Sequence, residues 1–217
     1  MIPNPYPGCF IVFEGIDGCG KTEQLQRVTA WLRKLTGQKT VIETTKEPGK
    51  ERFFGSKIYQ DLHTPGGLHK TDPFRFQMWY ACDSKEHLVK KVIPALQIEN
   101  IVLSDRYRPS MVYGARTPED INRLMQMNQM ILGEHFIWPD KILIFEISVP
   151  TAIERLSKKG KIFDGHERRQ VLEPVSWMYR EFALKYSNCQ LIDAERPADA
   201  VFEKVKAALS PTLDSPE

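Results

Sequence analysis

Short apolar runs along the chain alternate with segments in which apolar residues recur every three or four positions. Residues 9–14 (CFIVFE) form a nearly continuous apolar run, which is typical of a strand buried on both faces. Shorter or more mixed stretches at 40–44, 101–104, 141–147 and 189–192 are four further strand candidates. Because helical segments separate these runs, the pattern predicts an α/β fold with a parallel sheet covered by helices on both faces.

The helical segments also carry start signals. Asp72 before Pro73 predicts an N-cap and first turn, opening a long helix that extends to about Gln97. Thr151 and Glu154 form a T-x-x-E pattern, which predicts a capping box at the start of another helix. Apolar residues at helical spacing mark the first and last helices: Leu25, Val28, Leu32 and Leu35 before Gly37, and Val201, Phe202, Val205 and Leu209.

The chain has the size and composition of one globular domain. It has 217 residues, of which 41% are hydrophobic and 27% are charged, so we expect a single domain over residues 1–217. The proline-rich residues 1–8 predict a loose lead-in, and residues 210–217 predict a frayed tail.

Charge, apolar content and cysteine spacing exclude several classes of protein. A formal net charge of +2 argues against a general nucleic-acid coat or a membrane-surface protein. No apolar run approaches the roughly 18 residues of a membrane span, and the first residues lack the pattern of a secretory signal. The four cysteines form no C-x-x-C pair, which favours reduced thiols in a cytoplasmic protein.

A phosphate-binding loop follows the first predicted strand. The segment G-I-D-G-C-G-K-T fits G-x-x-x-x-G-K-[ST] and lies between an apolar strand and an amphipathic helix, as this motif requires. Lys21 would reach the β- and γ-phosphates of ATP, and Thr22 would hold Mg²⁺. An ordinary glycine-rich turn is the alternative, and the missing N-K-x-D segment disfavours a GTPase. The predicted ATP-binding residues are Gly15, Ile16, Asp17, Gly18, Cys19, Gly20, Lys21 and Thr22.

Two charged residues follow the third predicted strand. Ligands gather at the carboxyl ends of parallel strands, so Asp105 and Arg106 are expected to face the phosphate loop. Asp105 could hold Mg²⁺ or its water. Arg106 could stabilise a transferred phosphoryl group and clamp an acceptor phosphate.

Five motifs together resemble those of the thymidylate kinases. F-E-G-x-D-G-x-G-K-T (13–22), K-E-P-G (46–49), D-R-Y-x-x-S (105–110), P-D-K-I-L-I-F-E-I-x-V-P (139–150) and I-D-A (192–194) occur in the order and spacing of that family. The resemblance implies a three-layer P-loop NTPase fold with a five-stranded parallel sheet, flanking helices and a short lid. It also implies a homodimer that transfers the γ-phosphoryl of ATP to dTMP with Mg²⁺.

The resemblance assigns residues to the acceptor. Asp17 would accept a hydrogen bond from the 3′-hydroxyl of dTMP, and Arg106 would contact its phosphate. Tyr80 would stack on thymine, for which core packing is the alternative. The resemblance also places Lys46, Glu47, Ser84 and Tyr113 on the acceptor side.

A basic, glycine-hinged segment at about 155–167 is the predicted lid. The phosphate loop has Cys19 and no arginine, so the resemblance assigns catalytic cations to the lid. The candidates are Arg155, Lys158, Lys159 and Lys161, with a solvated charged loop as the alternative.

Three departures from the family pattern fall on the acceptor side and the lid. Ser84 stands where the family has an arginine that reads the thymine edge, and neither Arg75 nor Lys85 is placed to replace it. Tyr113 comes one residue early after Ser110, and the lid reads D-G-H-E. Two alternatives therefore remain open: a kinase for another nucleoside monophosphate or deoxynucleoside, and a non-catalytic nucleotide-binding regulatory protein.

Overall fold

Five parallel strands form the central sheet of the computed structural model, which describes residues 2–37, 39–160 and 165–213. The strand order is β3-β4-β2-β6-β7, and every neighbouring pair is parallel. The strands are β2 (Cys9–Glu14), β3 (Ile42–Lys46), β4 (Ile101–Asp105), β6 (Lys141–Glu146) and β7 (Cys189–Asp193). This confirms the predicted fold class and the predicted number of strands.

The register of the sheet brings chemically active residues to one edge. Phe13 of β2 lies opposite Asp105 of β4, and Asp105 lies opposite Lys46 of β3. The carboxyl ends of the three strands therefore meet, and Glu14 ends the central strand β2 at the same edge.

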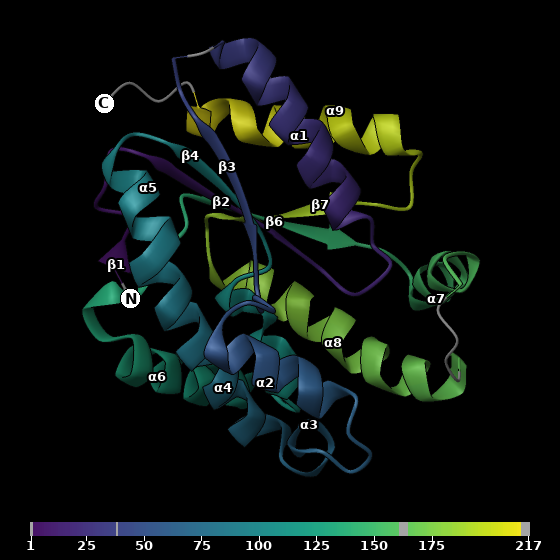
Figure 1. Cartoon of the computed structure of the whole chain (residues 1–217). Coiled ribbons are helices and arrows are strands. Elements are labelled where there is room, and N and C mark those ends of the chain that lie inside the picture. Colours follow the sequence, from purple (N-terminus) through teal and green to yellow (C-terminus); the bar gives the residue numbers. More distant parts are fainter. Residues whose placement is uncertain (1, 38, 161–164, 214–217) are drawn as a thin grey trace.

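Helices cover both faces of the sheet, as Figure 1 shows. Helices α1 and α9 lie on one face, and α4, α5 and α8 lie on the other. The helices are α1 (Lys21–Thr36), α2 (Phe53–Leu62), α3 (Leu68–Thr71), α4 (Pro73–His87), α5 (Ile93–Gln97), α6 (Pro118–Leu132), α7 (Val149–Lys158), α8 (Gly165–Lys185) and α9 (Ala198–Leu213). Short 3₁₀ segments occupy Arg108–Gly114 (η2) and Gly133–His135 (η3).

The core lies between the sheet and these helices. Side chains of β2, β4 and β6 are almost fully buried on both faces of the sheet, as continuous apolar runs predict. Phe13 and Phe145 stack across the β2–β6 pair with ring centroids 5.9 Å apart. This packing holds the end of β2 rigidly where the phosphate loop begins.

Several predicted boundaries need correction. The second strand covers Ile42–Lys46 and not 40–44, because it pairs with β4 over Ile101–Asp105. The long helix contains a π-helical turn (η1, Leu88–Val92) between α4 and α5. Leu35 is 63% exposed and does not belong to the buried face of α1.

The capping-box prediction was wrong. Helix α7 begins at Val149, and the N-cap is Ser148, whose hydroxyl accepts from the backbone N–H of Thr151 at 3.4 Å. Pro150 falls in the first turn, where a proline costs no hydrogen bond. The helix therefore starts three residues earlier than the T-x-x-E pattern predicted.

Both predicted loose ends are partly ordered. Ile2–Pro3 (β1) pairs in parallel with Ile137–Trp138 (β5). The Asn4 amide donates to the Asp140 carboxylate at 2.8 Å, which ties the lead-in to the start of β6. At the other end, α9 extends to Leu213, and residues 214–217 lie outside the described part of the chain.

Among the described helices, none has both the length and the apolar composition needed to cross a bilayer.

Candidate active site

The phosphate loop connects β2 to α1 in the conformation that the motif predicts. Gly15, Gly18 and Gly20 have φ values of 134°, 88° and 92°, in the region that favours glycine. Gly20 is the N-cap of α1 and offers no side chain to cap the helix. The first N–H groups and the positive end of α1 can therefore bind an anion.

Lys21 bends back over this loop. Its Nζ donates to the Ile16 carbonyl at 3.4 Å and lies 3.8 Å from the Asp17 carboxylate. The side chain is buried. A cation held beside a ring of backbone N–H groups suits phosphate oxygens.

Helix α7 packs directly on the loop. A Cβ on Gly18 would lie 2.5 Å from the Ala152 carbonyl oxygen, so no larger residue fits there. One turn further along α7, Arg155 donates from Nη2 to the Ala194 carbonyl at 3.1 Å. Its Nη1 is 4.0 Å from the Cβ position of Gly20. Arg155 thus lies beside the phosphate loop.

The other predicted lid residues lie differently. Lys158 pairs with Glu154 at 2.5 Å on the exposed side of α7, and Lys159 is exposed at the C-cap of α7. Lys161 lies outside the described residues. The predicted lid of 155–167 is helical at both ends, since α7 ends at Lys158 and α8 begins at Gly165.

Thr22 and Asp105 join the phosphate loop to the end of β4. The Thr22 hydroxyl donates to the Asp105 carboxylate at 2.7 Å. A hydroxyl and a carboxylate beside a phosphate site are the hard oxygen ligands that suit Mg²⁺, which keeps several waters and phosphate oxygens as further ligands. The described residues contain no group of three or more His, Cys, Asp or Glu side chains that could hold a metal. The donor set therefore fits Mg²⁺ held together with phosphates.

Arg106 is the residue around which the site is organised. Its backbone adopts φ = 74°, which is unusual for a residue with a side chain. Its Nη2 donates to Asp17 at 2.6 Å, and its Nη1 donates to the Gly15 carbonyl at 3.2 Å. The guanidinium also lies 5.3 Å from the ring centroid of Tyr113. The structure thus brings together Asp17, Lys21, Arg106 and Tyr113.

A buried carboxylate supports Arg106 from below. Glu14 accepts hydrogen bonds from the Tyr107 N–H, the Ser110 hydroxyl and the Tyr179 hydroxyl, each at 2.8 Å. Burial raises the pKa of Glu14, while the positive charge of Arg106 and these hydrogen bonds act in the opposite direction. Glu14 therefore connects β2, η2 and α8 beneath the phosphate loop.

On the acceptor side, Glu47 lies buried between β3 and α4. The Ser84 hydroxyl donates to Glu47 at 2.5 Å, and the His87 Nδ1 lies 2.9 Å from the same carboxylate. Burial acts to raise the pKa of Glu47, but the hydrogen bond and charge of His87, with Arg108 and Ser84, hold it below its usual value. Ser84 is thus engaged within the protein.

Tyr80 and Lys46 occupy different surroundings. Burial raises the pKa of the Tyr80 hydroxyl. The charge of Arg106 acts to lower this pKa, and the charge of Asp17 acts to raise it. Tyr80 therefore lies within electrostatic reach of Arg106 and Asp17, and its stacking on a base stays a prediction. Lys46 is exposed, and its Nζ lies 5.8 Å from the ring centroid of Tyr59 on α2.

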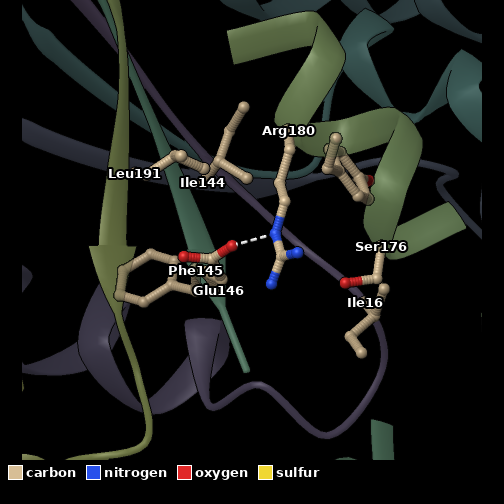
Figure 2. Close-up of a pocket in the computed structure, with 8 residues that line it drawn as sticks. Ile16, Ile144, Phe145, Glu146, Ser176, Arg180 and Leu191 are labelled. Carbon is tan, nitrogen blue, oxygen red and sulfur yellow. Dashed lines mark hydrogen bonds and ion pairs between the residues drawn. The ribbon is translucent and has the colours of Figure 1, made fainter. Parts of the chain in front are cut away.

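Helix α8 closes the site on the side of β6 and β7. Figure 2 shows Ser176 beside Ile16 of the phosphate loop, and Arg180 reaching across to Glu146 at the end of β6. The cavity between these residues has a volume of about 10 Å³, which holds one water at most. This cavity is therefore too small for a nucleotide.

Sequence reasoning missed several residues of the site. Glu14 could have been found, because a charged residue ends an otherwise apolar strand. Tyr179, Arg108 and Asn128 carried no such signal, since they come from segments that only the tertiary fold brings close. Arg108 donates from Nε to the Asn128 amide oxygen at 2.6 Å and from Nη1 to the Ser84 hydroxyl at 3.3 Å.

Comparisons with known proteins agree with this geometry. A family model described as "Thymidylate kinase" matches residues 13–205. A thymidylate kinase of Caldicellulosiruptor saccharolyticus is 33% identical over 215 residues, covering 95% of this chain and 98% of the relative. A thymidylate kinase of Mesoplasma florum is 33% identical over 207 residues, covering 92% and 94%.

The fold comparison agrees as well. The crystal structure of thymidylate kinase from Ehrlichia chaffeensis superposes with a TM-score of 0.66 at 23% identity, covering 93% of this chain and 98% of that one. The phosphate loop, the arginine after β4 and the matched length all point the same way, and the chain belongs to the thymidylate kinase family.

Proposed function

We propose that this protein transfers the γ-phosphoryl group of ATP to dTMP. An oxygen of the dTMP phosphate attacks the γ-phosphorus, and the bond from that phosphorus to the β,γ-bridging oxygen breaks. The products are dTDP and ADP. The observation that carries this proposal is the 2.6 Å contact between Arg106 and Asp17, which joins the arginine of the acceptor side to the ATP loop.

On the donor side, catalysis rests on charge neutralisation and positioning. The N–H groups of the loop and Lys21 hold the ATP phosphates, and Arg155 adds positive charge beside Gly20. We assign Lys159 a secondary role, because it is exposed at the end of α7. Thr22 and Asp105 would hold Mg²⁺, which supplies further charge neutralisation when bound.

On the acceptor side, Arg106 contacts the dTMP phosphate through its guanidinium. This requires Arg106 to give up part of its contact with Asp17, which then accepts from the 3′-hydroxyl of the sugar. Tyr80 stacks on the base, and Tyr113 packs on Arg106. Glu47 and Ser84 form the buried wall of this site. Lys46 contributes positive charge at its mouth.

The test is ADP release from ATP and Mg²⁺ with a panel of acceptors: dTMP, dUMP, dCMP, dGMP, dAMP, their ribose counterparts and thymidine. We expect ADP release to be fastest with dTMP. We expect no ADP release with thymidine, because thymidine has no phosphate for Arg106 to bind. A shifted preference would favour the kinase of another nucleotide. ATP binding without ADP release for any acceptor would favour the regulatory protein.

We also propose a cytoplasmic homodimer, in keeping with the family resemblance. The exposed apolar residues Met78, Val89 and Met130 on α4, η1 and α6 support a subunit interface there, because such side chains gain from burial. All four cysteines lie in the described chain and are free thiols, which suits a reducing compartment. Light scattering that gives the mass of a monomer, with no change on Met130→Glu, would refute the dimer.

A further inference from the structure

Arg108 is a buried cation without a complete set of partners. It begins η2, three residues after the end of β4, and is only 1% exposed. Two of its three nitrogens donate, to Asn128 and Ser84. The third, Nη2, is buried and has no hydrogen-bond partner among the described residues.

The neighbouring Arg52 shows what a satisfied buried arginine looks like. Its Nε and Nη2 both donate to the Asp83 carboxylate at 2.8 Å, and its Nη1 donates to Glu51 at 3.2 Å. A buried charged donor without a partner is costly. The unpaired nitrogen of Arg108 therefore points to a partner from outside the chain.

Other unpaired groups lie on the same elements. Of the four buried side-chain atoms without a partner in the described chain, three belong to α4 and η2, namely those of Gln77, Arg108 and Tyr113. These two elements pack against each other. Helix α4 carries Tyr80, and η2 begins two residues after Arg106. The unpaired polar atoms thus gather on the elements that form the acceptor side.

Arg108 contacts helix α4 one turn away from Tyr80. Its Nη1 bonds Ser84, which lies one helical turn beyond Tyr80 on the same face of α4. The charge of Arg108 also acts on the Tyr80 hydroxyl. Arg106 acts on the same hydroxyl, and Arg108 also acts on the buried carboxylate of Glu47.

A guanidinium only donates hydrogen bonds, so it selects acceptor atoms. Thymine and uracil present a keto oxygen at position 4, whereas cytosine presents an amino group there. A buried N–H donor can hydrogen-bond to the keto oxygen but not to the amino group. Facing an amino group, both donors would stay unpaired.

We propose that Arg108 determines base specificity by donating from Nη2 to the 4-keto oxygen of the acceptor base that stacks on Tyr80. This rests on the proposed function, since it assumes a pyrimidine monophosphate at that site. Arg108 thereby supplies the arginine contact that Ser84 cannot make from α4.

The test compares dTMP with 4-thio-dTMP, in which a poorly accepting sulfur replaces only that oxygen. Binding of each nucleotide is measured by calorimetry, and kcat/KM by ADP release. We expect the wild-type protein to prefer dTMP by about tenfold or more. We expect Arg108→Met to reduce this preference to within about twofold, and Arg75→Met, an exposed arginine on α4, to leave it unchanged.

Two further variants separate this role from support of the fold. Arg108→Lys keeps the charge near Glu47 but loses the fork of the guanidinium, and it should also lose most of the preference. Ser84→Arg combined with Arg108→Met should restore it. An unchanged preference in a folded Arg108→Met or Arg108→Lys protein, or no preference in the wild type, would overturn the proposal. Calorimetry needs no turnover, so failure of the kinase assay alone would count against the proposed function and not against Arg108.

Discussion

At the scale of single residues, the Arg106 guanidinium has two roles. It compensates the buried charge of Glu14, 3.8 Å away, and it presents its Nη2 to Asp17 at the edge of the phosphate loop. Neighbouring hydroxyls of Ser110 and Tyr179 hold Nη1. The group is therefore preorganised for a phosphate before any ligand arrives.

Replacing Arg106 should separate these two roles. We expect Arg106→Ala to lower kcat/KM for dTMP by about 100-fold or more, because a preorganised donor to the reacting phosphate is lost. The KM for ATP should change little. Arg106→Lys keeps a charge for Glu14 but not the fork, so it should recover stability more than activity. Wild-type kinetics in Arg106→Ala would place this residue outside the reaction.

Glu47 gives a prediction for pH. Its pKa in the folded protein lies below the usual value of 4.5, so its contribution to stability is complete above that pH and is lost as the pH falls below it. Glu47→Gln should lower the free energy of unfolding at pH 7 by about 1–3 kcal/mol. The difference from wild type should shrink between pH 5 and about pH 3.

Urea unfolding at a series of pH values measures this effect. Glu43→Gln, on the same strand, is the matched control and should cost much less stability at pH 7, because Glu43 is only half-buried. A deficit in Glu47→Gln that stays constant down to the lowest pH would contradict the assignment.

At the scale of elements, the contact between α7 and the phosphate loop controls the donor side. Gly18 leaves no room for a side chain against Ala152. We expect Gly18→Ala to move α7 away from the loop, to weaken ATP binding and to destabilise the protein by about 2 kcal/mol or more through overpacking.

Gly37 provides the control for this prediction. It also has a positive φ, of 62°, but no atom of the described residues lies within 4 Å of its Cβ position. Gly37→Ala should therefore cost only the backbone strain, about 1–3 kcal/mol, and leave ATP affinity intact. Equal losses in the two variants would show that backbone strain alone matters at Gly18.

Elements were predicted from the sequence more reliably than their ends. The three central strands follow from apolar runs, because burial on both faces requires such runs, whereas the edge strands β3 and β7 are only partly buried. The start of α7 did not, since Ser148 and Thr151 both suit an N-cap and only the structure shows which one bonds. In the same way, the loop motif revealed Lys21 and Thr22, whereas Arg108 depends on contacts with α4 and α6 that leave no local pattern.

At the scale of the whole molecule, a buried hydrogen bond connects two elements that lie far apart in the chain. The Tyr179 hydroxyl on α8 donates to Glu14 at the end of β2. Tyr179→Phe removes this donor from a buried carboxylate and should lower the free energy of unfolding by about 1–3 kcal/mol. Denaturant unfolding measures the loss. Tyr186→Phe, near the end of α8, is the control, and an equal effect there would contradict the special role of Tyr179.

The same bond has a consequence for how the protein is made. Its partners are 165 residues apart in the chain, so the ribosome synthesises the whole phosphate loop long before α8 exists to support it. Domains of this kind complete their folding late, because distant contacts must first overcome the entropy of the intervening chain. The nascent protein therefore exposes its ATP loop without a finished site, and it gains its nucleotide site only when nearly all of its length has emerged.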